Sequence, residues 1–427
     1  MAPSRPARVG SIRGVMPRHA AVHVDLDAVS HNVAALRAHV APAELCVVVK
    51  ADGYGHGAED VAAVALDAGA DRLAVALVEE GQELRDMGID APILLLSQPP
   101  ADAMADALAA GLTITVDTAA GIDAAAAAAS AAAAAADAWP GLAGDGQGWS
   151  VHLKVDTGMH RVGCAPHEAV GLALRVLERG LALDGTFTHL AVADEPRRPE
   201  TAEQLARFHT VLAEMAQAGI DPGVRHAANS AGALLHPDAR LDMVRVGIAT
   251  YGVGPAPDLD LPIDLHPAMS VAGEVSHVRT VDAGEGVSYG LRHRFDRPAR
   301  LAVVPLGYAD GVPRRLGGRG AEVLIGGVRR PIRGMVTMDQ LIVEVTDGPA
   351  VAVGDEVVLI GAQGGEVVTV DEWAGMIDTI SYEILCGFGP RLPRRHLQRL
   401  SHGHLDDGHL DDVTLSAGGS TGSGVAS

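Results

Sequence analysis

The chain has 427 residues, of which 48% are hydrophobic, so it can bury a large core in two domains. Its formal net charge of -21 argues against nucleic acid or an anionic membrane as a partner, because such partners need clustered basic residues. Cys46, Cys164 and Cys386 are few and far apart, which fits a reducing compartment and predicts a soluble cytoplasmic protein. No CxxC or HExxH spacing indicates a metal site.

The amino terminus and one internal stretch carry little chemistry. Residues 1–20 contain four arginines but no apolar central region, which excludes a secretory signal and predicts a flexible tail, with Met16 as an alternative start. The stretch 124–148 begins with alanines that favour a helix and ends with glycines that favour a loose surface loop. Its alanines are too weakly apolar to span a membrane, and we assign the stretch no function.

Residues 21–262 alternate short apolar strands, such as RLAVAL and LTITVD, with alanine-rich amphipathic segments. This alternation predicts a parallel sheet covered by helices, and a (β/α)8 TIM-type barrel occupies about 250 residues. A doubly wound open sheet is the alternative architecture. No GxGxxG turn supports dinucleotide binding in such a sheet.

The stretch VVVKADGYGHG at 47–57 joins a buried strand to a glycine-rich turn. Lys50 follows the apolar run, so partial desolvation would favour the neutral amine that a Schiff-base lysine needs. The glycines permit a tight turn and Tyr54 adds a hydroxyl to it. A lone lysine in this place is more often a solvated residue whose stem packs on apolar surface.

The whole string resembles the pyridoxal 5'-phosphate (PLP) lysine motif of the alanine racemases. In that family the motif lysine binds the cofactor and acts as one catalytic base, which implies both roles for Lys50. The motif tyrosine helps to hold the cofactor phosphate, which implies that role for Tyr54.

Further polar residues follow the expected strands, where a TIM barrel places its chemistry. Each has a plainer explanation by itself: an ion-paired arginine, a histidine in the core, or a helix cap. Their order along the chain resembles the alanine racemase set. They are Lys154, Arg161, His189, Asn229, Ser230, Arg245, Gly247 and Ile248.

The resemblance implies a role for each of them. Arg245 would donate to the PLP pyridine nitrogen and leave it unprotonated, because a guanidinium does not lose its proton, and this weakens the cofactor as an electron sink. His189 would lie between Arg245 and a catalytic tyrosine. Cofactor or phosphate contacts are implied for Asn229, Ser230 and the backbone of Gly247 and Ile248.

Arg161 is a candidate for binding the substrate carboxylate or the phenolic oxygen of the cofactor. Lys154 lies seven residues earlier in the sequence, and two cations would repel. Many family members carbamylate this lysine, which turns it into an anion that orients the arginine. Carbamylation of Lys154 is therefore expected here.

Residues 263–398 have a different texture, with short β-rich runs such as QLIVEVTD that predict a separate, mostly antiparallel β domain. Tyr289 lies in GVSYGLRH, and Met338 and Asp339 lie in GMVTMDQ. A strand tyrosine or a methionine is more often a packing residue. In the family, however, these loops enter the active site of the partner subunit, which implies a homodimer with shared active sites, Tyr289 as second catalytic base, and Met338 and Asp339 as substrate-binding residues.

The last match to the family is DTISYEILCGFGPRLPRR, in which Tyr382 is implied as a further phosphate ligand. Residues 399–427 are rich in Gly and Ser towards their end and are expected to be disordered.

The function implied is two-base interconversion of L-alanine and D-alanine, which supplies D-alanine for peptidoglycan. Lys50 would serve the D-enantiomer and Tyr289 the L-enantiomer. Three alternatives stay open: a broader amino-acid racemase that accepts serine, a PLP decarboxylase of the same fold and, with least support, a PLP-binding carrier without activity. Thr337 bears on the first alternative, because many relatives have cysteine at this position.

Overall fold

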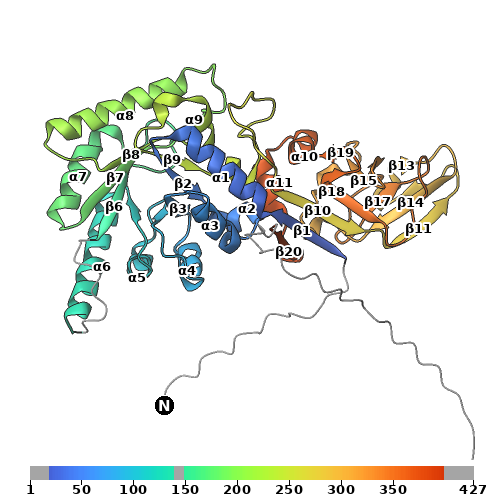
Figure 1. Cartoon of the computed structure of the whole chain (residues 1–427), viewed down its shortest axis with the longest axis horizontal. Helices are drawn as coiled ribbons and strands as arrows, with labels where there is room; N and C mark the ends of the chain where they lie inside the picture. Colours follow the sequence, from blue (N-terminus) through green and yellow to red (C-terminus); the bar gives the residue numbers. More distant parts are fainter. Residues whose placement is uncertain (1–18, 139–148, 399–427) are drawn as a thin grey trace, which may run out of the picture.

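The computed structural model describes residues 19–138 and 149–398, and it contains a barrel next to a β domain (Figure 1). Residues 1–18 and 399–427 of the two tails, and the glycine-rich residues 139–148, lie outside the described residues, whereas Ala20 at the end of the first tail begins a strand. The alanine-rich part forms a helix, as its composition predicts. Within the described residues, no helix is long and apolar enough to cross a bilayer.

Eight parallel strands form the barrel, in the order β4-β3-β2-β9-β8-β7-β6-β5. An isolated parallel bridge between Leu94 and Thr113 joins the two ends of this order. The expected TIM-type architecture is therefore confirmed, and the open-sheet alternative is wrong. The strands are β2 (Glu44–Val48), β3 (Arg72–Val75), β4 (Ile93–Leu95), β5 (Ile114–Val116), β6 (Ser150–Lys154), β7 (Ala182–Phe187), β8 (Val224–His226) and β9 (Met243–Val246).

Helices cover the outside of the barrel, and the strands are buried because each has a helix on one side and the barrel core on the other (Figure 1). Asp25 caps the first helix: its Oδ1 accepts from the backbone N–H groups of Asp27 and Ala28 at 2.9 and 3.0 Å. The helices are α1 (Leu26–Val40), α2 (Lys50–Gly55), α3 (Ala58–Asp67), α4 (Val78–Asp86), α5 (Met104–Ala109), α6 (Ala119–Ala138), α7 (Ala169–Glu178), α8 (Glu200–Gln217) and α9 (Ser230–Leu235).

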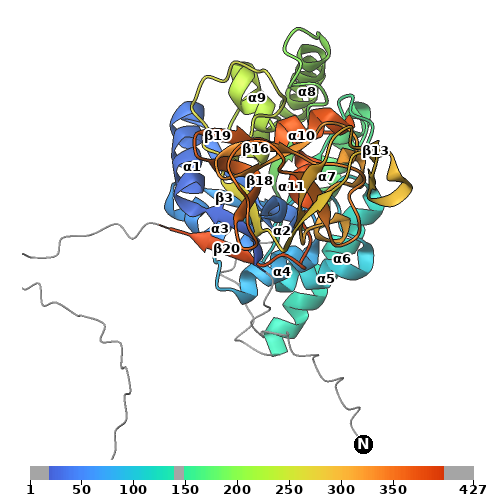
Figure 2. The same ribbon diagram turned by 90° about the vertical axis from the view of Figure 1, so that its right-hand side faces the viewer.

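The second part of the chain is mostly antiparallel, as predicted, and lies in front of the barrel in Figure 2. Its strands are β10 (Met269–Glu274), β11 (His277–Val281), β12 (Gly286–Val287), β13 (His293–Arg294), β14 (Ala299–Val304), β15 (Glu322–Ile325), β16 (Val328–Pro331), β17 (Leu341–Glu344), β18 (Glu356–Gln363), β19 (Glu366–Val368) and β20 (Arg394–Leu397). Two helices, α10 (Val370–Ile377) and α11 (Ser381–Gly387), precede β20.

The first strand, β1 (Ala20–Asp25), belongs to the sheet of the β domain. It pairs antiparallel with β10 and parallel with β20. The sequence suggested that residue 21 begins the barrel domain, and its strand pattern was right, but an apolar strand does not reveal its neighbours. The chain therefore enters the barrel from the other sheet, whereas the exact domain boundaries at 21–262 and 263–398 stay a prediction.

Candidate active site

Lys50 begins α2 immediately after β2, at the carboxyl end of that strand. The turn that follows is left-handed, with φ of 53° at Ala51, 53° at Asp52 and 55° at Tyr54. The sequence analysis attributed this turn to its glycines. Of the four left-handed residues 51–54, however, only Gly53 lacks a Cβ atom. Because a left-handed conformation costs about 1–2 kcal/mol per residue with a Cβ, other contacts must hold this turn.

Two barrel side chains hold the lysine turn from within. The Glu80 Oε1 atom, in α4, accepts from the Ala51 backbone N–H at 2.7 Å. The His56 Nδ1 atom lies 3.0 Å from the carbonyl oxygen of Gly53 and 3.1 Å from that of Tyr54, so it donates to both. Burial lowers the pKa of His56 to about 4, so the ring is neutral and this donor stays in place at neutral pH.

The carboxyl-terminal strand β20 holds the same turn from outside the barrel. Arg394 Nε donates to the carbonyl oxygen of Gly55 at 3.0 Å, and His396 Nε2 lies 2.7 Å from that of His56. His396 Nδ1 in turn meets the Asp60 carboxylate at 2.8 Å. Neither residue was assigned a role from the sequence. Because they lie some 340 positions from the turn, only the fold could bring them there.

The Lys50 side chain is half-buried. Burial, and then the positive charge of Arg161, lower its pKa, while Glu80 opposes this shift. A lowered pKa enlarges the fraction of neutral amine, which is the form that attacks a carbonyl. The environment of Lys50 thus suits covalent binding of an aldehyde.

A cradle of hydroxyl and amide groups surrounds Gly247, at the start of the short 3-10 helix Ile248–Tyr251. The Ser230 Oγ atom accepts from the Gly247 N–H at 3.0 Å. A Cβ atom on Gly247 would lie 2.3 Å from Tyr54 Oη, so only glycine lets this phenol sit there. The Tyr382 ring lies 6.1 Å from the Tyr54 ring. Hydroxyl and N–H donors of this kind fit the phosphate of PLP.

Arg245, in β9, is buried deep in the barrel. Its guanidinium donates to His226 Nδ1 at 2.7 Å and to the Thr188 carbonyl oxygen at 2.8 Å, and it lies 3.2 Å from His189 Nδ1. Burial lowers the Arg245 pKa to about 10, which still leaves the group charged at neutral pH. A charged donor in this place fits an unprotonated pyridine nitrogen.

The mouth of the barrel is strongly positive. Burial lowers the pKa of His189 well below its usual range, and the charges of Arg245, Arg161, Lys154 and Lys50 lower it further. Burial, followed by Arg245 and Arg161, also lowers the pKa of Lys154 to about 8, although its Nζ donates to the Leu96 carbonyl oxygen at 2.7 Å. An anion bound here would relieve this repulsion.

Asn229 is the amino-terminal cap of α9. Its Oδ1 accepts from the Gly232 N–H at 2.9 Å and its Nδ2 donates to the Leu190 carbonyl oxygen at 3.3 Å. These bonds orient the helix that begins with Ser230. The position in the fold thus also matches the plainer explanation, a helix cap.

The predicted residues of the β domain lie apart from the barrel mouth. The side chains of Tyr289 and Met338 are 72% and 52% exposed. Ser288 Oγ donates to the Met335 carbonyl oxygen at 2.6 Å, which joins their two loops, and Asp339 pairs with Arg391 at 2.8 Å. Among the described residues, no hydrogen bond or ring contact connects Tyr289 or Met338 with Lys50.

His31, Asp264 and His266 also lie near one another, with ligand atoms within 4.8 Å. All three are exposed, and the two imidazole rings stack at 3.9 Å with planes only 5° apart. Lone pairs of parallel rings do not converge on one ion. The group therefore carries no argument for a metal.

Comparison with known proteins identifies the family. The alanine racemase N-terminal domain model matches residues 24–255, and the alanine racemase C-terminal domain model matches residues 268–396. The chain belongs to the alanine racemase family. An alanine racemase of Symbiobacterium thermophilum is 48% identical over 379 residues, which is 87% of this chain and 95% of the relative.

Solved structures agree with this assignment. The alanine racemase of Streptomyces lavendulae is 38% identical, with a TM-score of 0.82 over 91% of this chain and 99% of that structure. The histidine racemase of Leuconostoc mesenteroides is 29% identical, with a TM-score of 0.79 over 90% of this chain and 100% of that structure. The family's enzymes use PLP, and the fold is thus shared between racemases whose names give different substrates.

Proposed function

We propose that this chain is a PLP-dependent alanine racemase that interconverts L-alanine and D-alanine through two bases. The family membership supports the activity, and Arg245 is the observation that carries the mechanism. A PLP enzyme that needs a strong electron sink keeps the pyridine nitrogen protonated with a carboxylate. A buried guanidinium does the opposite, which favours simple return of the proton over decarboxylation or transamination.

When bound, PLP supplies an electron-withdrawing ring that acidifies the substrate α-carbon. Lys50 would hold the cofactor, and its Nζ would remove or return the α-proton on one face of the substrate, the face used by D-alanine. The phosphate would be held by Tyr54, Ser230, Tyr382 and the backbone of Gly247 and Ile248, which lie near one another. Asn229 supports this cradle by capping the helix at Ser230.

Tyr289 of the partner subunit serves L-alanine from the opposite face. A phenol with an unperturbed pKa of about 10 is a weak base at neutral pH. The positive barrel mouth would lower the pKa of a phenol that enters it, because nearby cations favour the phenolate. His189, in contact with Arg245, is the residue we propose to transmit this effect.

The substrate carboxylate is assigned to Arg161, aided by Met338 and Asp339 of the partner subunit. We propose that Lys154 is carbamylated, which places an anion beside Arg161 instead of a second cation. The pKa of Lys154, about 8, supports this, since carbon dioxide reacts with the neutral amine.

The exposure of the β-domain loops supports a homodimer with shared active sites. Tyr289, Leu291 and Met338 are large apolar side chains that are 72%, 50% and 52% exposed, on loops joined by the Ser288 bond. Exposed apolar groups that gather in one place favour burial against a partner. The three cysteines are free, which fits the cytoplasm as the proposed location, and D-alanine for peptidoglycan is the proposed role.

A broader amino-acid racemase is the second candidate, because the histidine racemase shares this fold. A pocket for a methyl group rejects one added hydroxyl only weakly, so serine is a plausible second substrate. Thr337 precedes Met338 in the loop assigned to substrate binding and is the position to vary first.

The test is incubation of the PLP-loaded protein with L-alanine in deuterated water, with optical rotation and α-deuteration followed together. The expected result is loss of rotation at the rate at which deuterium appears at the α-carbon. Deuteration without inversion contradicts the two-base assignment, and release of carbon dioxide favours the decarboxylase. Absence of any exchange with bound PLP favours the carrier, and the relative rate with L-serine measures breadth.

A further inference from the structure

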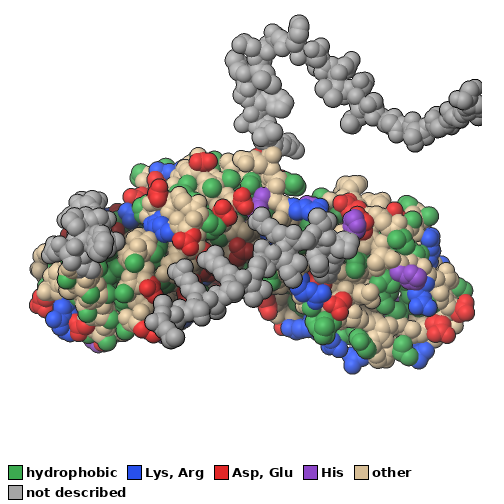
Figure 3. All heavy atoms as spheres, turned by 90° about the horizontal axis from the view of Figure 1, so that it is seen from below, with side chains coloured by type: hydrophobic (Ala, Val, Ile, Leu, Met, Phe, Trp, Pro, Cys, Tyr) green, Lys and Arg blue, Asp and Glu red, His purple; other side chains and the backbone are tan. Residues whose placement is uncertain are grey.

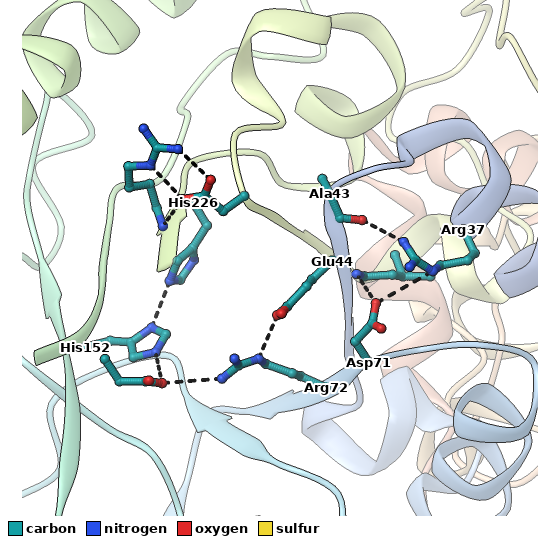
Figure 4. Close-up of polar contacts among 11 residues, drawn as sticks. Arg37, Ala43, Glu44, Asp71, Arg72, His152 and His226 are labelled. Atoms are coloured by element: carbon teal, nitrogen blue, oxygen red, sulfur yellow. Dashed lines mark hydrogen bonds and ion pairs between the residues drawn. The ribbon is translucent and has the colours of Figure 1, made fainter. Parts of the chain in front are cut away.

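A chain of hydrogen bonds runs from Arg245 through the barrel to the amino-terminal ends of its strands. Arg245 meets His226 Nδ1 at 2.7 Å, and His226 Nε2 meets His152 Nδ1 at 2.9 Å. His152 Nε2 then meets Asp184 Oδ2 at 3.2 Å. Figure 4 shows the two imidazoles pointing at each other, with Arg72 beyond His152. The chain thus crosses four neighbouring strands, β9, β8, β6 and β7.

The two ends of this chain fix the direction of every bond in it. A guanidinium only donates, so His226 Nδ1 must be the acceptor and the His226 proton must sit on Nε2. That proton donates to His152 Nδ1, so the His152 proton also sits on Nε2. It donates to Asp184, which as a carboxylate only accepts. No other arrangement of protons on two neutral rings satisfies all three bonds.

Burial keeps both rings neutral. His226 and His152 are fully buried. Burial lowers the pKa of His226 well below the usual range of histidine, and it also lowers the pKa of His152. Phe187 stacks on the His226 ring at 4.5 Å with planes 6° apart, which restrains its rotation. Each ring therefore has one donor and one acceptor, and its tautomer depends on its neighbours in the chain.

The strand that carries Asp184 is shaped for this contact. Val151 pairs with Leu183 and His152 pairs with Gly185, so Asp184 is the extra residue of a β-bulge in β7. A bulge re-aims a side chain. A Cβ atom on Gly185 would lie 2.6 Å from His152 Cε1, so glycine makes room for the imidazole.

Arg72 holds Asp184 from the other side. Its NH1 lies 3.4 Å from Asp184 Oδ2, and its Nε donates to Glu44 at 2.8 Å. Hydrogen bonding from His152, together with the charge of Arg72, lowers the pKa of Asp184 below its usual range. Asp184 thus stays a carboxylate at neutral pH, which is the state the chain requires.

We propose that Asp184 is a positioning residue for Arg245: through His152 and His226 it fixes a one-way series of proton donors that leaves a lone pair facing the guanidinium. Asp184 touches neither substrate nor cofactor. Without it, Arg245 alone opposes reversal of the two imidazoles, so reversal costs less, and a reversed His226 would present an N–H to the N–H of Arg245. The guanidinium would then lose a buried acceptor and shift. The inference rests on the proposed role of Arg245 for its effect on turnover, but the tautomers themselves do not depend on that role.

The direct test is nitrogen NMR of PLP-loaded protein labelled with 15N-histidine, since the shift of each ring nitrogen reports whether it carries the proton. In the unmodified protein, both His152 and His226 are expected to be protonated at Nε2. Asp184→Asn is expected to mix the tautomers of both rings, because an amide both donates and accepts. The matched control is Asp242→Asn: Asp242 pairs with Arg225 at the same end of the barrel and is similarly exposed, 35% against 38% for Asp184.

Kinetics give the second readout. Asp184→Asn is expected to lower kcat about tenfold to a hundredfold with KM for alanine nearly unchanged, and Asp242→Asn to change neither. Protonation of His226 at Nδ1 in the unmodified protein, or unchanged tautomers in Asp184→Asn, overturns the proposal whatever the activity. Altered tautomers with full kcat would overturn only the link to turnover, and absence of racemisation in the unmodified protein would overturn the proposed function instead.

Substitution of the middle residue keeps the proposal testable if Asp184→Asn does not fold. His152→Gln retains an acceptor for His226 and a donor for Asp184, whereas His152→Leu has neither. The glutamine variant is expected to keep the His226 proton on Nε2 and most of kcat. In the leucine variant the His226 Nε2–H has no acceptor, so mixed tautomers of His226 and a lower kcat are expected. Equal behaviour of the two variants would contradict the proposal.

Discussion

The barrel mouth and the exposed β-domain loops are two halves of one proposed site, and they are built in opposite ways. Arg245 donates to His226 and to the Thr188 carbonyl oxygen, and the Lys50 turn is held from both domains. Tyr289 and Met338 are instead exposed to solvent. Figure 3 shows acidic and basic side chains interspersed on one face, without a continuous basic patch that would suggest a nucleic acid. In the function we propose, one chain thus supplies the cofactor-binding residues and leaves the second base to a partner.

The largest effect is expected when the two halves are disabled separately. Lys50→Ala and Tyr289→Phe should each lower racemisation by about 10³-fold, because each removes one base. After the two variants are unfolded together and refolded as mixed dimers, one site in each mixed dimer combines Lys50 from one chain with Tyr289 from the other. About a quarter of normal activity should return, because half of the dimers are mixed and half of their sites are intact.

The control is the same mixture without joint unfolding, which should stay inactive if the dimers do not exchange. Recovery of no activity after mixing, with mixed dimers demonstrated by mass, would mean that each site uses its own Tyr289. The comparison between the two halves would then fail.

The free energy of unfolding should decrease at acidic pH because of a buried histidine in the barrel half, His56. Burial lowers the His56 pKa from 6.5 to about 4, so between these values the unfolded chain binds more protons than the folded one. The free energy of unfolding should therefore fall by about 2 kcal/mol from this group as pH drops from 7 to 5. Urea unfolding at both pH values measures this change, and His56→Gln should reduce it.

His209→Gln is the matched control for that experiment, because His209 is exposed on α8. If the two variants depend on pH equally, then His56 is not held neutral in the folded protein. The lysine turn would then be less rigid than its contacts indicate.

Removing the contact between β20 and the lysine turn tests how far stability and PLP binding of the barrel half depend on the β domain. Arg394→Met leaves the Gly55 carbonyl without its donor, which should lower the free energy of unfolding by about 1–3 kcal/mol and weaken PLP binding. Arg395→Met is the control, because the next residue of a strand faces the other way and Arg395 is exposed. Equal PLP affinity in the two variants would show that this clamp has no role at the site.

The smallest effect concerns Lys154. With a pKa of about 8, about a quarter of its amine is neutral at pH 7.5, against about 0.1% for an ordinary lysine. Protein in 13C-bicarbonate should therefore give a carbamate signal by carbon NMR that Lys154→Met abolishes. A signal that survives this substitution would assign the carbamate to another amine, and absence of a signal would leave Arg161 beside a cation.

Local sequence was sufficient for much of this. The alternating pattern predicted the barrel, and the β-rich runs predicted the second domain, because burial on two faces or one leaves a distinct periodicity. The string VVVKADGYGHG at 47–57 was sufficient for the family resemblance, and the order of Lys154, Arg161 and Arg245 agreed with it. His152 lies two residues before Lys154 and so on the same face of its strand, which was an available hint of a polar interior.

Only the tertiary structure decided where these residues meet. β1 has the pattern of any apolar strand, and its partners in the β domain depend on packing far along the chain. The left-handed turn after Lys50 contradicts the conformation that its non-glycine residues prefer, so it exists because Glu80, His56 and Arg394 hold it. Likewise Asp184 and Arg245, distant in sequence, act through two histidines. The sequence by itself determined which reactive side chains are present and the local periodicity of each element. Long-range contacts determined the direction of the hydrogen-bond chain, the tautomers of its two histidines and the left-handed turn after Lys50. These features depend on neighbours that are distant in sequence, which no local pattern records.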